Sequence, residues 1–532
     1  MRTLFNLLVL AWLMPWLATA QPSDTVFTVI LEGGTVYDGL GTEPIVADVG
    51  VLDDRITTIG DLSDRRAGLR LDVAGLAVVP GFIDIHSHAD RGILERPLAE
   101  NYVRQGVTTV VGGPDGSSAY PVGEFLARLD VTPPAINFGT MVGHNTIRRR
   151  VMGNENRTPT PDELAAMQDS VKHAMRDGAF GLSTGLKYVP GAYAETEEVI
   201  ALAREAAQYG GFHKSHMRDE GLDVLASVEE TIRIGEEGHL PTQLTHHKVI
   251  GKFMWGQSTE TLRMVDAARA RGVDVSIDQY PYIASSTGLT ILFPAWSLEG
   301  NQDDLVARLQ DAEARAKIKD AIIFNLERDR GGGDPANVAV AYCAWDTTLN
   351  GLNLAQILEQ RGQLVTVERA AELAMDLQEQ GGFQGIFFAM SEDDVERIMQ
   401  HPMTMIASDG GIPMMDRGVP HPRNYGTFAR VLGRYVREQG VLSFAEALRK
   451  MTSLPAQRLG LSERGVVRVG AFADIAVLDP ETIIDHATFA EPHQYATGVQ
   501  YVFVNGRAAL LEGAMTGVRA GRALRKSQPT DH

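Results

Sequence analysis

Two histidines lie two residues apart at the end of an apolar stretch, in residues 81–88. Alternate residues of a β-strand point to the same face, so the side chains of His86 and His88 are expected to point the same way. Neutral imidazoles bind Zn²⁺ at about 2.0 to 2.1 Å. The pair therefore indicates a metal site at the end of a strand, although alone it is equally typical of an exposed loop.

Three more residues that can bind a metal ion follow short apolar runs. They are His216, His246 and Asp409, and Gly410 allows the chain to turn directly after the last of them. A single such histidine is more typical of a structural hydrogen bond, but four histidines at three strand ends favour a hydrolytic metal site. An aspartate in this place can bind metal and also accept a proton from a water that the metal activates.

The composition narrows the possible partners. The 532 residues are 44% hydrophobic and 22% charged, as in a globular protein, and the net charge is −19. This acidity argues against a nucleic-acid partner and against binding to an anionic membrane surface, because both attract clustered lysine and arginine. With Cys343 as the one cysteine, an intrachain disulfide and a cysteine-based zinc cluster are both impossible. Any metal is therefore expected on histidines and carboxylates.

The elements that must position these residues fall into two groups. Strand-like runs separated by turn residues occur near both chain ends, at 26–31, 47–52, 55–59, 474–478 and 499–504. We expect residues 21–80 and 465–532 to pair into one small β-sandwich.

Between the chain ends, strand-like and helical stretches alternate. Strand-like runs such as 107–111, 273–277 and 403–407 alternate with amphipathic stretches such as 161–176 and 196–208. Alternation of this kind predicts an α/β fold, a TIM-like (β/α)8 barrel over residues 81–464, with its site at the C-terminal ends of the strands. Residues 300–350 interrupt the rhythm, which indicates an inserted subdomain or lid, or alternatively a long loop.

The first twenty residues have the three-part form of a secretory signal. Arg2 precedes an apolar stretch over 4–17, and Ala18-Thr19-Ala20 provides a cleavage site. The alternative is a membrane anchor, but the apolar run is short for a bilayer span. We expect export to the periplasm or the extracellular space, without stable membrane insertion after cleavage.

With these motifs in order along the chain, the sequence resembles the amidohydrolase superfamily and, within it, the N-acyl-D-amino-acid deacylases, or D-aminoacylases. The resemblance spans residues 26–504 and rests on six blocks, at 80–88, 181–191, 216–220, 246–248, 408–410 and 421–423. It implies zinc, as two ions, bound by His86, His88, His216, His246 and Asp409. It also implies that Asp409 is the general base and acid, and that the substrate's α-carboxylate is bound by Arg423, Lys248 and either Tyr188 or Tyr280.

One position departs from that family. Its members commonly carry a cysteine that bridges two metals at the end of the second strand, where this chain has Asp115. Many other amidohydrolases bridge their metals with a carboxylated lysine, and Lys187 follows the fourth strand-like run. A carbamate is an anion that can be shared by two cations, whereas a protonated amine cannot. We therefore predict carboxylated Lys187 as the bridge, with Asp115 as the alternative bridge or as a hydrogen-bond partner near the metals.

Lys248 and Arg423 bear on the substrate, because a lysine and an arginine together suit a carboxylate. The alternatives are a structural hydrogen bond for Lys248 and a surface position for Arg423. The expected substrates are small molecules: N-acyl-D-amino acids, or dipeptides that end in a D-residue, with the stereochemistry implied by the resemblance alone. Two other hypotheses are a hydantoinase-like hydrolase of cyclic amides or ureides and a metal-free interaction scaffold.

Overall fold

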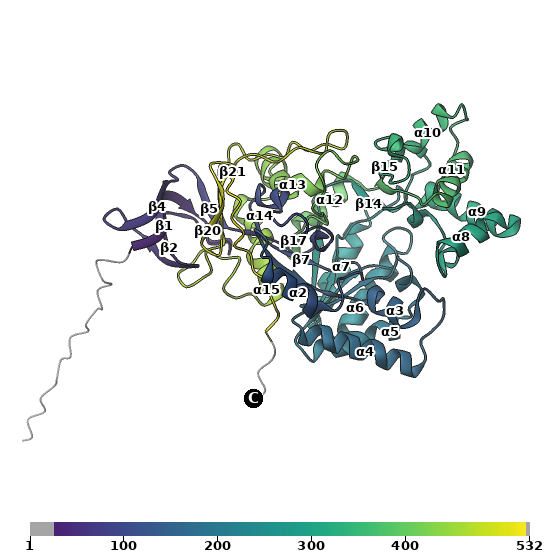
Figure 1. The fold of residues 1–532 in the computed structure, drawn as a ribbon, viewed down its shortest axis with the longest axis horizontal. Helices are drawn as coiled ribbons and strands as arrows, with labels where there is room; N and C mark the ends of the chain where they lie inside the picture. Colours follow the sequence, from purple (N-terminus) through teal and green to yellow (C-terminus); the bar gives the residue numbers. More distant parts are fainter. Residues whose placement is uncertain (1–25, 528–532) are drawn as a thin grey trace, which may run out of the picture.

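The computed structural model describes residues 26–527, and strands from both chain ends share one nine-stranded sheet in it (Figure 1). Its order is β21-β20-β19-β18-β5-β1-β2-β3, with β4 paired to β1. The early and late strands meet where β18 runs antiparallel to β5, with Ile475 opposite Pro80. The strands are β1 (Val26–Val36), β2 (Ile45–Leu52), β3 (Arg55–Gly60), β4 (Arg66–Asp72), β5 (Ala77–Pro80), β18 (Ile475–Leu478), β19 (Val499–Val504), β20 (Arg507–Leu511) and β21 (Ala514–Met515).

This sheet is held together by alternate residues that share one apolar core. Val29 and Leu31 of β1 pack with Val49 and Val51 of β2 and with Ile475 of β18. Side chains two apart on a strand face the same way, so the alternation seen in the sequence is what brings the two chain ends together.

The central strands form two parallel runs, β6-β7-β8 and β9-β10-β11-β12-β13-β17. A parallel bridge between Ser87 and Gly410 links the chain just after β6 to the chain just after β17. The architecture is therefore an α/β fold of the TIM-barrel type. The strands are β6 (Phe82–Asp84), β7 (Val107–Gly112), β8 (Asn137–Thr140), β9 (Val142–Gly143), β10 (Gly181–Gly185), β11 (Phe212–His216), β12 (Thr242–Leu244), β13 (Val275–Gln279) and β17 (Thr404–Ile406).

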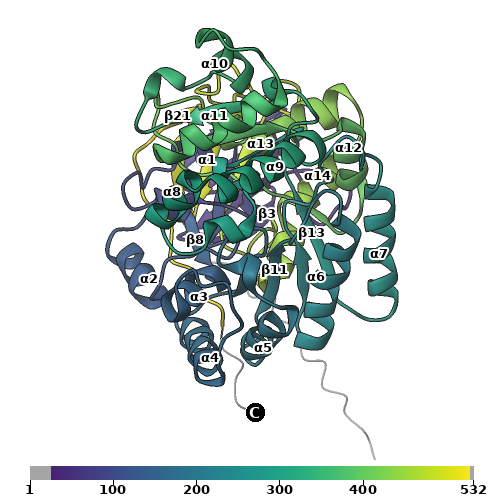
Figure 2. The same ribbon diagram turned by 90° about the vertical axis from the view of Figure 1, so that its right-hand side faces the viewer.

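Helices follow these strands and cover their outer side (Figure 2). The helix expected at 161–176 is α4 (Pro161–Arg176), which begins with a capping box of Thr160 and Glu163. The one expected at 196–208 is α5, which ends one residue earlier. The helices of this part include α2 (Val122–Val131), α3 (His144–Met152), α5 (Thr196–Ala207), α6 (Val224–Gly238), α7 (Ser258–Ala270), α12 (Glu392–Gln400), α13 (Arg423–Arg430), α14 (Phe444–Met451) and α15 (Ser453–Leu459).

A separate unit, called the insert below, extends from β14 to β16. Its strands form an antiparallel sheet in the order β14-β16-β15, and its helices pack around a core that includes Leu292, Ile322, Leu373 and Phe387. The interruption expected at residues 300–350 lies inside this larger unit. Its elements are β14 (Ala284–Gly288), α8 (Gln302–Gln310), α9 (Ala312–Arg328), β15 (Val338–Tyr342), α10 (Leu354–Gln360), α11 (Val367–Glu379) and β16 (Gln384–Phe388).

Within residues 26–527, no helix combines the length and the apolar character needed to cross a bilayer. The secretory signal expected at residues 1–20 lies outside the described residues.

Candidate metal centre

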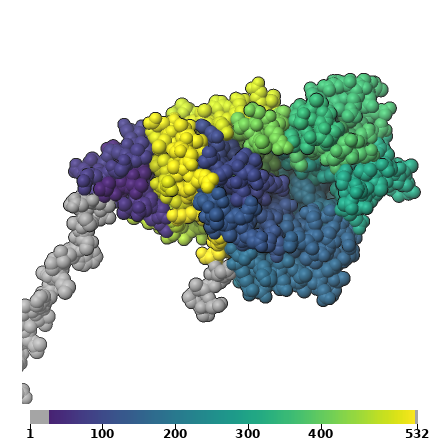
Figure 3. All heavy atoms as spheres, viewed as in Figure 1, coloured from purple at the N-terminus to yellow at the C-terminus, as the bar shows by residue number. Residues whose placement is uncertain are grey.

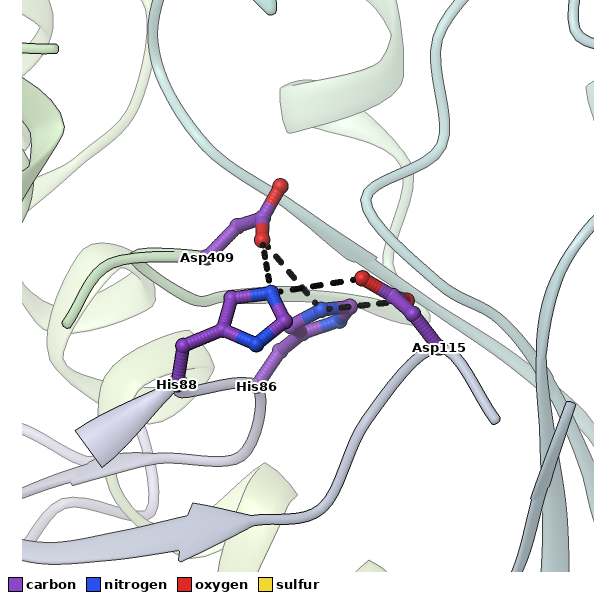
Figure 4. Close-up of side chains that lie close together, drawn as sticks. All are labelled: His86, His88, Asp115 and Asp409. Carbon is purple, nitrogen blue, oxygen red and sulfur yellow. Dashed lines mark hydrogen bonds and ion pairs between the residues drawn. The ribbon is translucent and has the colours of Figure 1, made fainter. Parts of the chain in front are cut away.

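His86 and His88 face two carboxylates, Asp115 and Asp409, at the ends of three neighbouring strands (Figure 4). The Nε2 atom of His86 lies 3.4 Å from Oδ1 of Asp115 and 3.5 Å from Oδ1 of Asp409. The Nε2 atom of His88 lies 3.3 Å from Oδ2 of Asp115 and 3.1 Å from Oδ1 of Asp409. One atom from each of the four side chains lies within 4.8 Å of the others. Two imidazoles and two carboxylates at this spacing suit a divalent cation such as Zn²⁺.

A second group shares one member with the first. It consists of Asp115, His216 and His246, again with donor atoms within 4.8 Å of one another. The Nε2 atom of His246 lies 3.3 Å from Oδ1 of Asp115 and 2.7 Å from Nδ1 of His216. Asp115 thus lies between the two groups, and the structure brings together all four histidines and Asp409.

The turns that follow β7 and β17 determine where the side chains of Asp115 and Asp409 point. Asp115 and Asp409 have φ values of 53° and 49°, a left-handed conformation that aspartate tolerates better than most residues. The ends of β6 and β17 are joined by hydrogen bonds from the backbone N–H of Asp409 to the carbonyl of His86 (2.9 Å) and from that of His88 to the carbonyl of Gly410 (2.6 Å). Asp84 accepts from the N–H and the hydroxyl of Ser408. The chain's own hydrogen bonds therefore tie these strand ends together.

Several polar atoms of the centre are buried without a hydrogen-bond partner among the described residues. They are both ring nitrogens of His86, Nδ1 of His88, Nε2 of His216 and Oδ1 of Asp115. Buried polar atoms are almost always paired, so a cluster of unpaired nitrogen and oxygen atoms in one place fits a site that binds a cation. Burial disfavours the ionised form of Asp115, but His86 and His246 outweigh it and hold the pKa of this carboxyl well below its usual range. The carboxylate is therefore ready to bind metal at neutral pH.

Lys187 lies elsewhere in the same cavity. Its Nζ is 3.0 Å from Oδ2 of Asp219 and 3.6 Å from Oδ2 of Asp329. Burial opposes the charge, but Asp329 and Asp219 overcome it and raise the pKa of the amine. A carbamate requires a neutral amine, which this surrounding disfavours. The structure does not bring the amine of Lys187 together with the histidines, whereas it places Asp115, the alternative bridge, among them.

This difference gives a direct test. We expect Lys187→Met to retain the zinc content of the unchanged protein, because the amine pairs with Asp219 and Asp329 and not with the candidate ligands. Metal analysis after gel filtration measures the zinc bound per chain. Lys317→Met, on the exposed side of α9, is the control. If Lys187→Met loses zinc while the control does not, and a short added carboxylate recovers the zinc, the result would support Lys187 as the bridging residue.

The side chains predicted to bind the substrate carboxylate line a cavity of about 1630 Å³ beside the metal centre. The Tyr280 ring lies 5.5 Å from Nζ of Lys248 and 4.8 Å from Cζ of Arg423, and its buried hydroxyl has no partner among the described residues. Arg423 pairs with Asp409 at 2.7 Å, and Lys248 pairs with Glu220 at 2.5 Å. Tyr188 packs against the His216 ring and accepts from Thr287. Figure 3 shows the surface hollowed between the insert and the lobe of α3 and α4.

Two functional candidates escaped the sequence reasoning. Oδ1 of Asp278, near the end of β13, lies 3.3 Å from Nδ1 of His86 and accepts from the N–H of His246. Glu220, four residues after His216, lies 3.1 Å from Nδ1 of His246. Carboxylates on the far nitrogen of a ligating histidine set its tautomer and orientation. In the sequence, the feature that could have identified Asp278 is its place as a carboxylate near the end of a strand of apolar character.

Comparison with known proteins agrees with this geometry. A model of the amidohydrolase family matches residues 348–509. The D-aminoacylase of Alcaligenes xylosoxydans xylosoxydans is 39% identical over 96% of this chain and 99% of its own length. The N-acyl-D-glutamate deacylase of that organism is 37% identical, over 94% and 96% of the two chains.

Solved structures point the same way. A crystal structure of D-aminoacylase, an enzyme described with a binuclear metal centre, is 39% identical and matches with a TM-score of 0.80 over 94% of this chain and all of that one. The N-acyl-D-glutamate deacylase of Bordetella bronchiseptica, solved with zinc and a phosphonate mimic of the tetrahedral intermediate, is 36% identical with a TM-score of 0.81 over the same shares. D-hydantoinase, at 15% identity and a TM-score of 0.57, shares the fold. The chain therefore belongs to the amidohydrolase family that includes D-aminoacylase and N-acyl-D-glutamate deacylase.

Proposed function

We propose that this protein hydrolyses the linear amide bond of N-acyl-D-amino acids, or of dipeptides with a C-terminal D-residue. The observation that carries the proposal is the placement of Lys248, Tyr280 and Arg423 directly beside the two metal-ligand groups. Two cations that share one wall with a metal centre suit a substrate whose carboxylate lies close to its scissile amide. The D-configuration is taken from the relatives' activities.

We assign one Zn²⁺ to His86, His88, Asp115 and Asp409 and the second to Asp115, His216 and His246. When bound, such an ion supplies a water of pKa about 7 and polarises the scissile carbonyl. The residues of the chain do the rest. Asp409 accepts the proton of the attacking water on its carboxylate and delivers it to the departing amine nitrogen.

Arg423 has a second part in this scheme. Its Nη1 atom forms an ion pair with Oδ2 of Asp409, while Nε2 of His88 lies next to Oδ1 of the same carboxylate. When the substrate carboxylate binds Arg423, the guanidinium is drawn from Asp409 and Oδ2 becomes free to accept a proton. Substrate binding and activation of the base are thereby linked through one side chain.

The test is a panel of N-acetyl-D-amino acids, their L-enantiomers and their D-carboxamides, read by release of primary amine from the zinc-loaded protein. We expect turnover of the D-acids. We expect the carboxamides to lose about 10- to 150-fold in kcat/KM, because a hydrogen bond to a charged group contributes about 1.5 to 3 kcal/mol. Equal turnover of both enantiomers would contradict the D-specific assignment.

A hydantoinase-like reaction is the other candidate, and only the shared fold supports it. Opening of a hydantoin ring releases no primary amine, so turnover of cyclic substrates together with inactivity on the linear panel would favour it.

The finer architecture is also proposed. We infer that residues 81–464 close into a (β/α)8 barrel, which the bridge between Ser87 and Gly410 supports. We further infer that residues 21–80 and 465–532 form a β-sandwich, and that residues 1–20 direct export to the periplasm or beyond.

A further inference from the structure

A buried arginine of the insert contacts Glu220, which lies next to the metal centre. Arg330 follows α9, and 1% of it is exposed. Its guanidinium donates to Oγ of Ser285 (3.2 Å), and its Nη2 atom lies 3.5 Å from Oε2 of Glu220. A charge taken out of water is costly unless it is paired, and two carboxylates face this guanidinium: Oε2 of Glu220, and Oδ2 of Asp329 at 3.7 Å from its Nε atom.

Glu220 lies directly behind His246. Its Oε1 atom is 3.1 Å from Nδ1 of that histidine and 2.5 Å from Nζ of Lys248, and its Oε2 atom faces Arg330. Nε2 of His246 points the other way, toward Asp115. Nζ of Lys248 lies 2.7 Å from the same Nδ1 atom, so Glu220 and Lys248 together orient the ring of this candidate metal ligand, and Glu220 is the carboxylate of the two.

Two cations share this one carboxylate, and they differ in what else they can reach. Lys248 lines the cavity beside Tyr280, where the substrate carboxylate is proposed to bind. If Lys248 turned to the substrate and no other cation were near, Glu220 would be left buried with an unpaired charge, 1% exposed. Arg330 faces the opposite oxygen, Oε2, at 3.5 Å, so this contact does not involve the oxygen that Lys248 binds.

We propose that Arg330 is a positioning residue that holds Glu220 behind His246 while Lys248 is released to the substrate's carboxylate. The inference rests on the proposed function for the part played by Lys248. The role of Arg330 toward Glu220 and His246 depends on the contacts alone.

The insert is built to present this side chain. The backbone N–H of Arg330 donates to the carbonyl of Asn325 in the last turn of α9. The preceding residue, Asp329, faces Lys187 at 3.6 Å, which ties the end of α9 to the loop after β10. A Cβ on Gly331 would lie 2.5 Å from the carbonyl of Leu326, so the chain turns here only with glycine. The end of α9 is thereby connected to His246 through Arg330 and Glu220.

The experiment compares Arg330→Met and Arg330→Lys in the full chain. Zinc affinity is measured by competition with a chromophoric chelator, and kcat and KM are measured on an N-acetyl-D-amino acid. We expect Arg330→Met to weaken the more loosely bound zinc and to lower kcat by about 10- to 100-fold, as is typical when a group that orients a metal ligand is lost. Arg330→Lys should recover part of both, because it restores a cation facing Glu220.

A double-mutant cycle with Glu220→Gln separates this role from a structural one. If Arg330 acts through Glu220, adding Arg330→Met to Glu220→Gln costs little more, and the two effects do not add. Arg315→Met serves as the matched control, since that arginine pairs with Asp376 and Glu379 inside the insert.

Unchanged zinc affinity in Arg330→Met, or additive effects in the cycle, would overturn the proposal. The chelator assay also keeps it distinct from the proposed function. Failure of the unchanged protein on every panel substrate would refute the activity, while a weakened zinc site in Arg330→Met would still support the link from Arg330 to the metal centre.

Discussion

Replacement of Asp409 by asparagine is expected to lower kcat by at least about 10² to 10⁴, the usual contribution of a general base. The amide keeps the shape of the side chain but cannot accept the proton that the attacking water must lose. Within the described part of the chain, His86, His88 and Arg423 contact this carboxylate, and the other carboxylate of its metal-ligand group, Asp115, faces the same two histidines. Amine release from an N-acetyl-D-amino acid, together with metal analysis, measures the effect.

Asp416→Asn is the matched control for that variant. Asp416 lies on the exposed loop that follows Asp409, and it also has a positive φ, which asparagine adopts readily. We expect its activity to remain near that of the unchanged protein. An Asp409→Asn protein that retains zinc and more than a tenth of kcat would remove Asp409 from the proton transfer.

The second large effect is expected at Asp115. Asp115→Asn keeps the volume of the side chain but removes the one carboxylate common to both metal-ligand groups. Histidine nitrogens approach it from both sides, at 3.3 to 4.0 Å. Without this negative charge, two cations would be held close together with no shared anion between them. We expect the bound zinc to fall from two ions to one or fewer and kcat/KM to fall by about 10- to 100-fold or more.

A thiolate provides the rescue for this variant. Asp115→Cys restores an anion that two zinc ions can share, so it should recover much of the lost metal. Elemental analysis of the three proteins, prepared side by side, measures the stoichiometry. Two zinc ions in Asp115→Asn would show that another group bridges them, and Lys187 would be the first candidate.

Local patterns in the sequence were sufficient for much of this protein. The alternation of strand and helix predicted an α/β fold of the TIM-barrel type. The bounds expected for α4 agree with the structure, and its capping residues, Thr160 and Glu163, are only three positions apart in the sequence. His86, His88, His216, His246 and Asp409 each follow an apolar run, and parallel strands bring such positions to one rim. These were predictable because each depends on its own few neighbours.

Contacts between distant segments were not predictable in this way. The insert is larger than its sequence pattern indicated, since β14 pairs with β16 about a hundred residues later. Glu220, Asp278 and Arg330 come from three different loops or strand ends: Asp278 meets His86, Glu220 meets His246, and Arg330 meets Glu220.

The position of the bridging residue also depends on contacts between distant segments. Both Asp115 and Lys187 follow parallel strands, and both are of a type that can serve, so the sequence by itself determined the kind of site that was predicted and most of its candidate ligands. Which of the two lies among the histidines was decided only by the tertiary structure, and this position is what supports Asp115 as the proposed bridge. The left-handed turn at Asp115 directs its carboxylate between the histidines, while Asp219 and Asp329, supplied by other segments, hold the amine of Lys187 away in its charged form.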